Sequence, residues 1–349
     1  MNSISIITIL IILINSTIII QGIPDVSNSF LGVDDPGVSH FPLYLGLKMH
    51  IRCYTNVTRA NQYGPIALFD SGVPFYSTAW VSIIPSVLLN MPSWNISKAC
   101  FIDRYGYGWS DSAPLPVTTQ DYVGRLRESL LVAGLFTGKY ILVGWSWGSI
   151  FVQTYSMTYP DEVVGILSID GTDSQWGFIP SNQQVVINFT NTVAYLTNSN
   201  SLSEFVNADE SYSRSYGWFP NTLREGLGGF TNCSIDASQQ IFMTNKFLKT
   251  AVQELNIMVI SSAILNFTYT LKASPTPLGD LPYVNIYSSY HNDPDWTNRQ
   301  IHMASLSSNS IAMQFSTGHF YTFDNPTAIV SAISALSNKI AIKLQSTGC

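Results

Sequence analysis

The sequence predicts an α/β fold, in which a mostly parallel β-sheet carries helices on both faces and is interrupted by an inserted cap. Short apolar stretches of strand length alternate with stretches of helical periodicity over residues 23–173. The same alternation returns over residues 277–349, whereas residues 174–276 are polar, aromatic and irregular. We therefore expect a core in two parts, with the cap between them.

The first part of the core is expected to contain most of the sheet. Its strands are apolar, compact and bounded by turn residues, and they are residues 43–54, 65–70, 98–104, 140–143 and 163–169. Apolar side chains at helical spacing predict helices at residues 120–135 and 149–159, the second ended by Pro160.

The second part continues the pattern. It predicts strands at residues 281–288 and 310–315 and helices at residues 296–306 and 326–339. Within the cap only residues 239–257 have a weak helical pattern. Its aromatic side chains suit either a cap core or an apolar substrate tunnel.

The N-terminal segment, residues 1–22, is typical of a signal peptide. It has an apolar run at residues 4–14 and no Lys or Arg. Cleavage predicts a secreted protein, or one within the secretory or endolysosomal pathway. The alternative is an uncleaved anchor, the one case in which we expect membrane association. Beyond this segment five glycosylation sequons agree with secretion, at Asn56, Asn95, Asn188, Asn232 and Asn266.

Composition excludes several other functions. Charged residues make up 11% of the chain, the net charge is −6, and no basic run is present, so we expect no nucleic-acid partner. The four cysteines have no zinc-site spacing. Gly106 and Gly108 follow a strand, but Asp111 stands where a dinucleotide fingerprint needs its third glycine. No cofactor and no metal are expected.

The strongest motif is Gly144-Trp145-Ser146-Trp147-Gly148 between a predicted strand and a predicted helix. A sharp strand-to-helix turn exposes the central serine and leaves no room for Cβ atoms beside it. Ser146 is therefore the candidate nucleophile. The two flanking tryptophans fit either packing beneath the turn or an apolar acyl pocket.

A serine nucleophile needs a histidine base. His319 lies in a loop between the strand at residues 310–315 and the last helix, where a base late in the chain is expected. The other four histidines, at positions 40, 50, 291 and 302, are less suitably placed.

The carboxylate that orients this base is expected to be Asp293, in the loop after the strand at residues 281–288. Asp295 lies in the same loop. Asp170 and Asp173, which follow the strand at residues 163–169, are further alternatives.

Several motifs in order resemble the α/β-hydrolase superfamily, most closely its cap-bearing esterase, lipase and iminopeptidase-like branch. They are residues 69–74 (FDSGVP), 103–110 (DRYGYGWS), 144–148 (GWSWG) and 318–320 (GHF). The resemblance implies an oxyanion hole formed by the backbone N–H groups of Val73 and Trp147. The branch usually has His-Gly where this chain has Ser71-Gly72.

The resemblance also implies a disulfide. In that fold the strands at residues 50–54 and 98–104 would be neighbours, so Cys53 and Cys100 should lie within bonding distance. Cys233–Cys349 is a weaker second pair.

These residues together predict a serine hydrolase that cleaves an ester or related acyl bond of a small, apolar substrate. An aminopeptidase is the first alternative, and it needs a carboxylate for the substrate amine. The insertion offers Asp209, Glu210, Glu225 and Glu254. The second alternative is a non-catalytic binding protein with the same fold.

Overall fold

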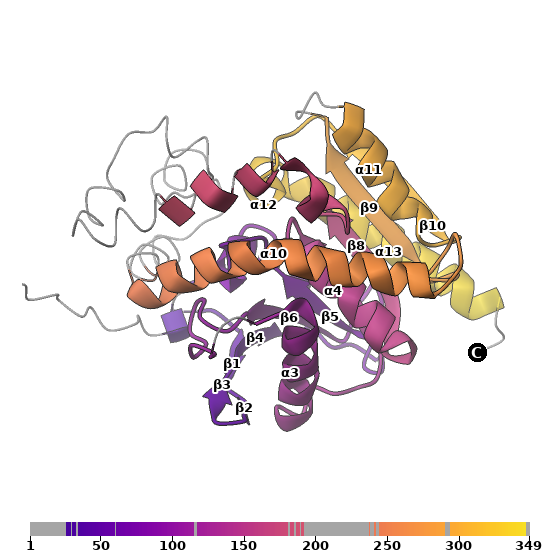
Figure 1. The fold of residues 1–349 in the computed structure, drawn as a ribbon. Helices are drawn as coiled ribbons and strands as arrows, with labels where there is room; N and C mark the ends of the chain where they lie inside the picture. The colour runs from indigo at the N-terminus through magenta and orange to yellow at the C-terminus, as the bar shows by residue number, and fades with distance from the viewer. Residues whose placement is uncertain are drawn as a thin grey trace, which may run out of the picture.

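The central feature of the fold is an eight-stranded sheet in the order β1-β4-β6-β5-β7-β8-β9-β10 (Figure 1). The computed structural model describes residues 26–346 except 29, 33, 60, 115–116, 181, 185, 189, 192–236, 238–240, 242–243 and 290–293. Strand β4 is antiparallel to both of its neighbours, β1 and β6. The remaining pairs, from β6 to β10 across the sheet, are all parallel. The strands are β1 (Val38–His40), β4 (His50–Tyr54), β5 (Ile66–Asp70), β6 (Lys98–Asp103), β7 (Tyr140–Trp145), β8 (Val163–Ile169), β9 (Tyr283–Ser288) and β10 (Ser310–Phe315).

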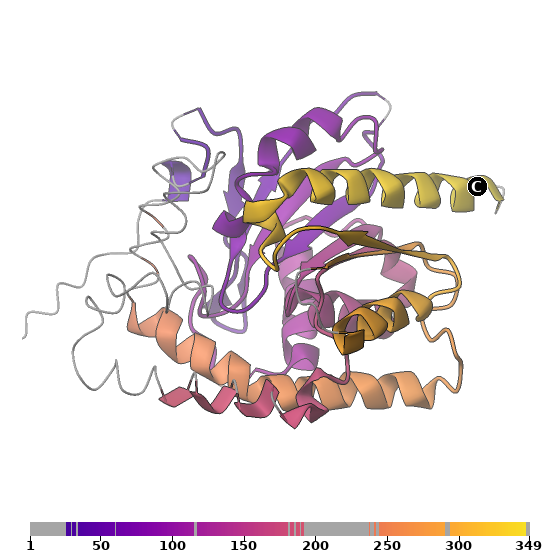
Figure 2. The same ribbon diagram turned by 90° about the horizontal axis from the view of Figure 1, so that it is seen from above.

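Helices cover both faces of this sheet, as Figure 2 shows from above. Helices α3 (Thr119–Val132), α4 (Gly148–Thr158) and α11 (Pro294–Ser305) lie on one face, and α2 (Ile84–Asn90) and α13 (Pro326–Ser346) lie on the other. The structure also has short helical turns: η1 (Val26–Asn28), η2 (Ser77–Trp80), η3 (Pro160–Glu162), η4 (Trp176–Phe178) and α12 (Tyr321–Asp324). The predicted fold class is confirmed.

One predicted strand is wrong in detail. Residues 43–48 form a small hairpin of β2 (Leu43–Tyr44) and β3 (Leu47–Lys48), separate from β4. Leu45 and Gly46 between them both have positive φ, 51° and 77°. Two consecutive residues with positive φ are typical of a tight hairpin turn. Leucine is not a typical turn residue, so the sequence did not indicate this turn.

The long helix α10 (Asn245–Leu271) is the main described element of the inserted segment. It lies outside α4 and runs past η4 (Figures 1 and 2). By length and composition alone α10 and α13 could each cross a membrane, and in the described structure both pack against the core. The expected signal peptide lies outside the described residues, as does most of the expected cap.

The expected Cys53–Cys100 disulfide is present, with the two Cα atoms 4.1 Å apart. The two cysteines face each other directly in the antiparallel register of β4 and β6. Cys233 and Cys349 lie outside the described residues.

Candidate active site

Ser146 lies at a sharp turn between β7 and α4. Its φ is 54°, a left-handed conformation that is strained for a residue with a side chain. The turn closes tightly, because a Cβ on Gly144 would lie 2.5 Å from the carbonyl oxygen of Gly148, and one on Gly148 would lie 2.4 Å from that of Asp70. The two motif glycines therefore serve close backbone approach.

His319 lies beside this serine. The Ser146 hydroxyl donates to Nε2 of His319 at 3.0 Å, although the two residues are 173 positions apart. The imidazole is 28% exposed and Ser146 is half-buried, so both can be reached from solvent. The indole of Trp145 donates to the backbone carbonyl of His319 at 3.0 Å and holds the loop after β10 in place.

The carboxylate at the other imidazole nitrogen belongs to Asp170. Nδ1 of His319 donates to its Oδ2 at 2.6 Å, and the carboxylate is fully buried. Its second oxygen accepts from the backbone N–H of Ser288 at 2.9 Å and from the indole of Trp296 at 3.2 Å. Asp170 also has a positive φ, 44°. A buried carboxylate with donors on both oxygens is held in one orientation.

The carboxylate that contacts His319 in the structure is therefore that of Asp170, one of the alternatives given above, and not that of the preferred Asp293. Asp293 itself lies outside the described residues. Asp173 pairs instead with Arg299 at 3.0 Å, and Asp295 is exposed in the first turn of α11.

The order of the strands explains why the sequence left both Asp170 and Asp293 as candidates for this carboxylate. Ser146 follows β7 and His319 follows β10, and both β8 and β9 lie between them in the sheet. An acid at the carboxyl end of either strand could reach the histidine.

The expected oxyanion donors belong to the residue after Ser146 and to the residue after Gly72, which lies against Ser146. Trp147 directly precedes α4, where backbone N–H groups have no partner within the helix. Val73 follows Gly72, whose added Cβ would lie 2.8 Å from Cβ of Ser146. Among the described residues, neither backbone N–H donates to another group of the chain. Two unpaired donors beside a serine hydroxyl are suited to an oxyanion.

Comparison with known proteins gives the family of this fold. Residues 68–332 match the description "Alpha/beta hydrolase family". The chain belongs to the alpha/beta hydrolase family.

Solved structures of other hydrolases have the same fold. A haloalkane dehalogenase variant from Bradyrhizobium elkanii is 18% identical, with a TM-score of 0.64 over 88% of this chain and 99% of that one. A thermophilic esterase from Thermogutta terrifontis is 17% identical, with a TM-score of 0.58 over 88% and 99%. At such low identity the likeness concerns the fold alone.

The matches to two curated relatives cover a smaller part of the chain. An uncharacterized vacuolar membrane protein of Saccharomyces cerevisiae is 27% identical over 134 residues, which are 35% of this chain and 20% of that protein. An uncharacterized protein of Schizosaccharomyces pombe is 30% identical over 79 residues, which are 23% and 15%. The chain thus spans about a fifth or less of the length of these relatives.

The expectation of a secreted, secretory or endolysosomal protein is corrected by this comparison. The relative in Saccharomyces cerevisiae is a vacuolar membrane protein. Its location does not agree with a soluble secreted product.

The alpha/beta hydrolase core also contains a buried ionic cluster beside the active site, which sequence reasoning missed. Arg104, directly after β6, contacts Asp70 through Nη1 at 2.6 Å and Glu254 of α10 through Nε at 2.7 Å. The hydroxyl of Tyr107 donates to Glu254 at 2.8 Å. The carboxylate of Glu254 is therefore already engaged by two residues, Arg104 and Tyr107. Asp209, Glu210 and Glu225, the other candidates for binding a substrate amine, lie outside the described residues.

A second Ser–His–Asp arrangement occurs away from Ser146. The hydroxyl of Ser39 donates to Nε2 of His50 at 2.8 Å, and Nδ1 of His50 donates to Asp103 at 2.7 Å. Ser39 lies within strand β1, its oxygen accepts from Arg52 at 3.0 Å, and His50 is fully buried. These contacts suit a structural network, so the geometry favours Ser146 as nucleophile.

The two tryptophans of the motif are both buried, at 1% and 0% exposure. Trp145 contacts the rings of Phe75, Phe320 and Phe323, and Trp147 contacts Phe151. Packing therefore accounts for both side chains.

Proposed function

We propose that this protein is a serine hydrolase that cleaves an ester or related acyl bond through an acyl-enzyme intermediate. One observation carries the proposal: the continuous hydrogen-bond chain from Ser146 through His319 to the buried Asp170, at 3.0 and 2.6 Å. A serine hydroxyl becomes a useful nucleophile at neutral pH when an oriented imidazole can accept its proton.

In this mechanism Oγ of Ser146 attacks the acyl carbon while its proton passes to Nε2 of His319. Asp170 stabilises the imidazolium that forms. The imidazolium then protonates the leaving oxygen as the bond to the acyl carbon breaks. Water, deprotonated by the same imidazole, attacks the acyl-enzyme and releases the acid and Ser146.

The oxyanion of each tetrahedral intermediate would be bound by the N–H groups of Val73 and Trp147. In other hydrolases the removal of one such donor costs about 10²–10³ in kcat. Trp147 supplies its N–H at the start of α4, where the helix dipole adds to the stabilisation of negative charge.

The substrate we propose is small and apolar. The rings of Phe75, Phe320 and Phe323 all contact Trp145. Phe320 also contacts the ring of the proposed catalytic histidine, His319. Phe320 and Phe323 are only half-buried. An aromatic wall of this kind favours an apolar acyl or alcohol group.

An aminopeptidase would need a carboxylate other than Glu254 for the substrate amine, because Glu254 is paired with Arg104. A non-catalytic role is less well supported because the strained φ of Ser146 at 54° has no evident structural use.

A membrane location is part of the proposal, on the likeness to the yeast vacuolar membrane protein. Fractionation of cells that express the full chain tests it: recovery with membranes after alkaline carbonate washing supports it, and recovery in the soluble fraction contradicts it.

The function itself is tested with the full-length protein and a fluorophosphonate probe, followed by peptide mapping. We expect one adduct, on Ser146, and turnover of p-nitrophenyl acyl esters but not of aminoacyl-naphthylamides. A protein that neither reacts with the probe nor hydrolyses any ester would contradict the proposal, and turnover of the naphthylamides alone would favour the aminopeptidase.

A further inference from the structure

The guanidinium of Arg104 joins two parts of the molecule that are far apart in sequence. On one side Nε and Nη2 donate to the two carboxylate oxygens of Glu254, at 2.7 and 2.9 Å. On the other side Nη1 donates to the carbonyl of Ser71 at 2.6 Å and Nη2 to the carbonyl of Gly72 at 3.2 Å. Arg104 thus bridges helix α10 and the loop after β5.

The hydrogen bond from Arg104 to the carbonyl of Gly72 affects the expected oxyanion donor, the N–H of Val73, because both groups belong to the same peptide bond. The carbonyl of Gly72 and the N–H of Val73 belong to one planar peptide unit, in which they point in opposite directions. The same carbonyl also accepts from the N–H of Phe75 at 2.8 Å. Two donors on this oxygen therefore fix the direction of the Val73 N–H, and the positive charge beside it polarises that N–H.

The cluster is buried, which makes its geometry specific. The side chains of Arg104 and Glu254 are 4% and 11% exposed. A buried guanidinium is stable only when its donors are satisfied in a fixed arrangement. A lysine at this position would keep the charge but could not reach the carboxylate and the loop carbonyls with one planar fork.

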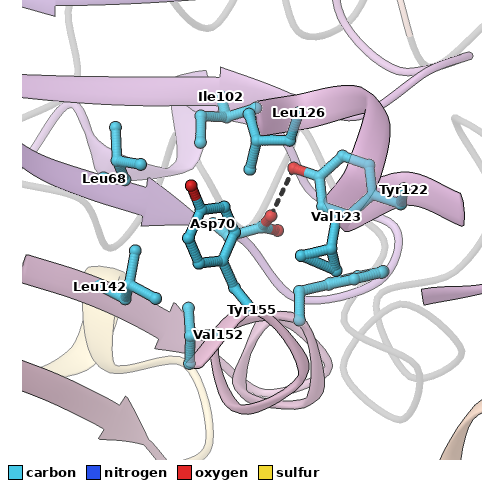
Figure 3. Close-up of a pocket in the computed structure, with 10 residues that line it drawn as sticks. Leu68, Asp70, Ile102, Tyr122, Val123, Leu126, Leu142, Val152 and Tyr155 are labelled. Carbon is cyan, nitrogen blue, oxygen red and sulfur yellow. Dashed lines mark hydrogen bonds between the residues drawn. The ribbon is translucent and has the colours of Figure 1, made fainter. Parts of the chain in front are cut away.

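The guanidinium of Arg104 also donates to Asp70, in addition to Glu254 and the loop carbonyls. One oxygen of Asp70 accepts from Arg104 at 2.6 Å and the other accepts from the hydroxyl of Tyr122 at 2.6 Å. Figure 3 shows the Tyr122 contact among the side chains that line a pocket. The pocket has a volume of about 10 Å³, and its other lining residues are mainly apolar. Among the described residues, Arg104 is the cation that pairs with Asp70.

We propose that Arg104 is a positioning residue for the reaction, which fixes the Val73 oxyanion donor and makes its direction depend on Glu254 of the inserted helix. The inference rests on the proposed function. It adds that the inserted segment supports the chemistry through α10, whatever substrate the segment admits.

The experiment compares the Arg104→Lys protein with the wild type. Because an oxyanion donor acts in the transition state, we expect kcat to fall about 10²-fold while KM changes less than about 3-fold. Inhibition by an octyl trifluoromethyl ketone, which forms an oxyanion on Ser146, should weaken by the same factor as kcat/KM. Inhibition by the matching methyl ketone, which remains a carbonyl compound, should not change.

Arg127→Lys is the matched control. Arg127 also donates through Nε to a glutamate, Glu162, at 2.7 Å. Glu162 follows the C-terminal end of α4, whereas Ser146 precedes its N-terminal end. We expect its kcat and both inhibition constants to equal those of the wild type. Glu254→Gln provides a second variant if Arg104→Lys does not fold, and we expect its kcat to fall about 10-fold with the same contrast between the two ketones.

The outcomes separate the two proposals. If the wild type does not react with a fluorophosphonate, the proposed function is wrong and this inference is wrong with it. If the wild type reacts but the folded Arg104 and Glu254 variants keep full kcat, or lose affinity for both ketones equally, only the positioning role is overturned.

Discussion

Ser146 and Asp170 follow neighbouring parallel strands, and both have left-handed backbone conformations, with φ of 54° and 44°. The N–H of Ser146 donates to the carbonyl of Ile169, the residue before Asp170, at 2.9 Å. The two turns are therefore fixed relative to each other by the sheet. The histidine completes the arrangement from a strand two places further along.

The first prediction separates the two serines that lie beside a histidine. Ser146→Ala should abolish fluorophosphonate labelling and reduce kcat by about 10⁶. Ser39→Ala should label at the rate of the wild type, because Ser39 belongs to a network within β1, β4 and β6. Gel fluorescence and ester hydrolysis measure both. Labelling that persists in Ser146→Ala and disappears in Ser39→Ala would reverse the assignment.

The second prediction concerns the acid. Asp170→Asn should reduce kcat by about 10⁴ with little change in KM, since an asparagine no longer stabilises the correct tautomer and the imidazolium of His319. Asp295→Asn is the control, and steady-state kinetics should find it unchanged. Asp293→Asn should also retain activity; a larger loss there than in Asp170→Asn would restore the original assignment.

The third prediction concerns Gly72. A Cβ at this position would lie 2.8 Å from Cβ and 3.3 Å from Oγ of Ser146, so Gly72→Ala must displace the serine or the oxyanion loop. We expect kcat to fall about 10²-fold or more. Gly124→Ala, within helix α3, has only the Tyr159 hydroxyl at 4.0 Å. It should keep full kcat and gain up to about 1 kcal/mol of stability. Equal kinetics in both variants would contradict the close approach.

The fourth prediction concerns the disulfide. Cys53 and Cys100 close a loop with a sequence separation of 47, for which chain entropy gives about 4 kcal/mol of stabilisation. The Cys53→Ala/Cys100→Ala double variant should lose about that much in denaturant unfolding. Non-reducing peptide mapping of the wild type provides the check, and recovery of two free thiols would disprove the bond.

The fifth prediction concerns pH. Burial raises the pKa of Asp70 to about 6, even though Arg104 and Tyr122 oppose the rise. Between pH 4 and 6 the folded chain therefore binds a proton at Asp70 that the unfolded chain releases. The contribution of Asp70 to the unfolding free energy thus decreases as the pH rises through this window, by up to about 3 kcal/mol.

The measurement is urea unfolding across that pH range. The difference in unfolding free energy between the wild type and Asp70→Asn should move in favour of the variant as the pH rises. A difference that stays constant, or moves the other way, would show that Asp70 is ionised throughout.

The sequence by itself determined much of this protein. Apolar patterning placed the strands at residues 163–169 and 310–315 with the bounds that the structure has. The glycine-flanked Ser146 and the loop histidine His319 were identifiable because local chemistry, a tight turn and a loop after a strand, specifies them. The pairing of Cys53 with Cys100 followed from the strand order of the family that the motifs resemble.

Only the tertiary structure decided between Asp170 and Asp293, and only it paired Arg104 with Glu254. These contacts join residues that are 149 and 150 positions apart. No local pattern encodes them. The physical reason is that parallel strands bring several carboxyl ends to one edge of the sheet, so chain order leaves more than one carboxylate within reach of the histidine. The left-handed turn at Asp170 and the packing of α10 then select the contact that forms.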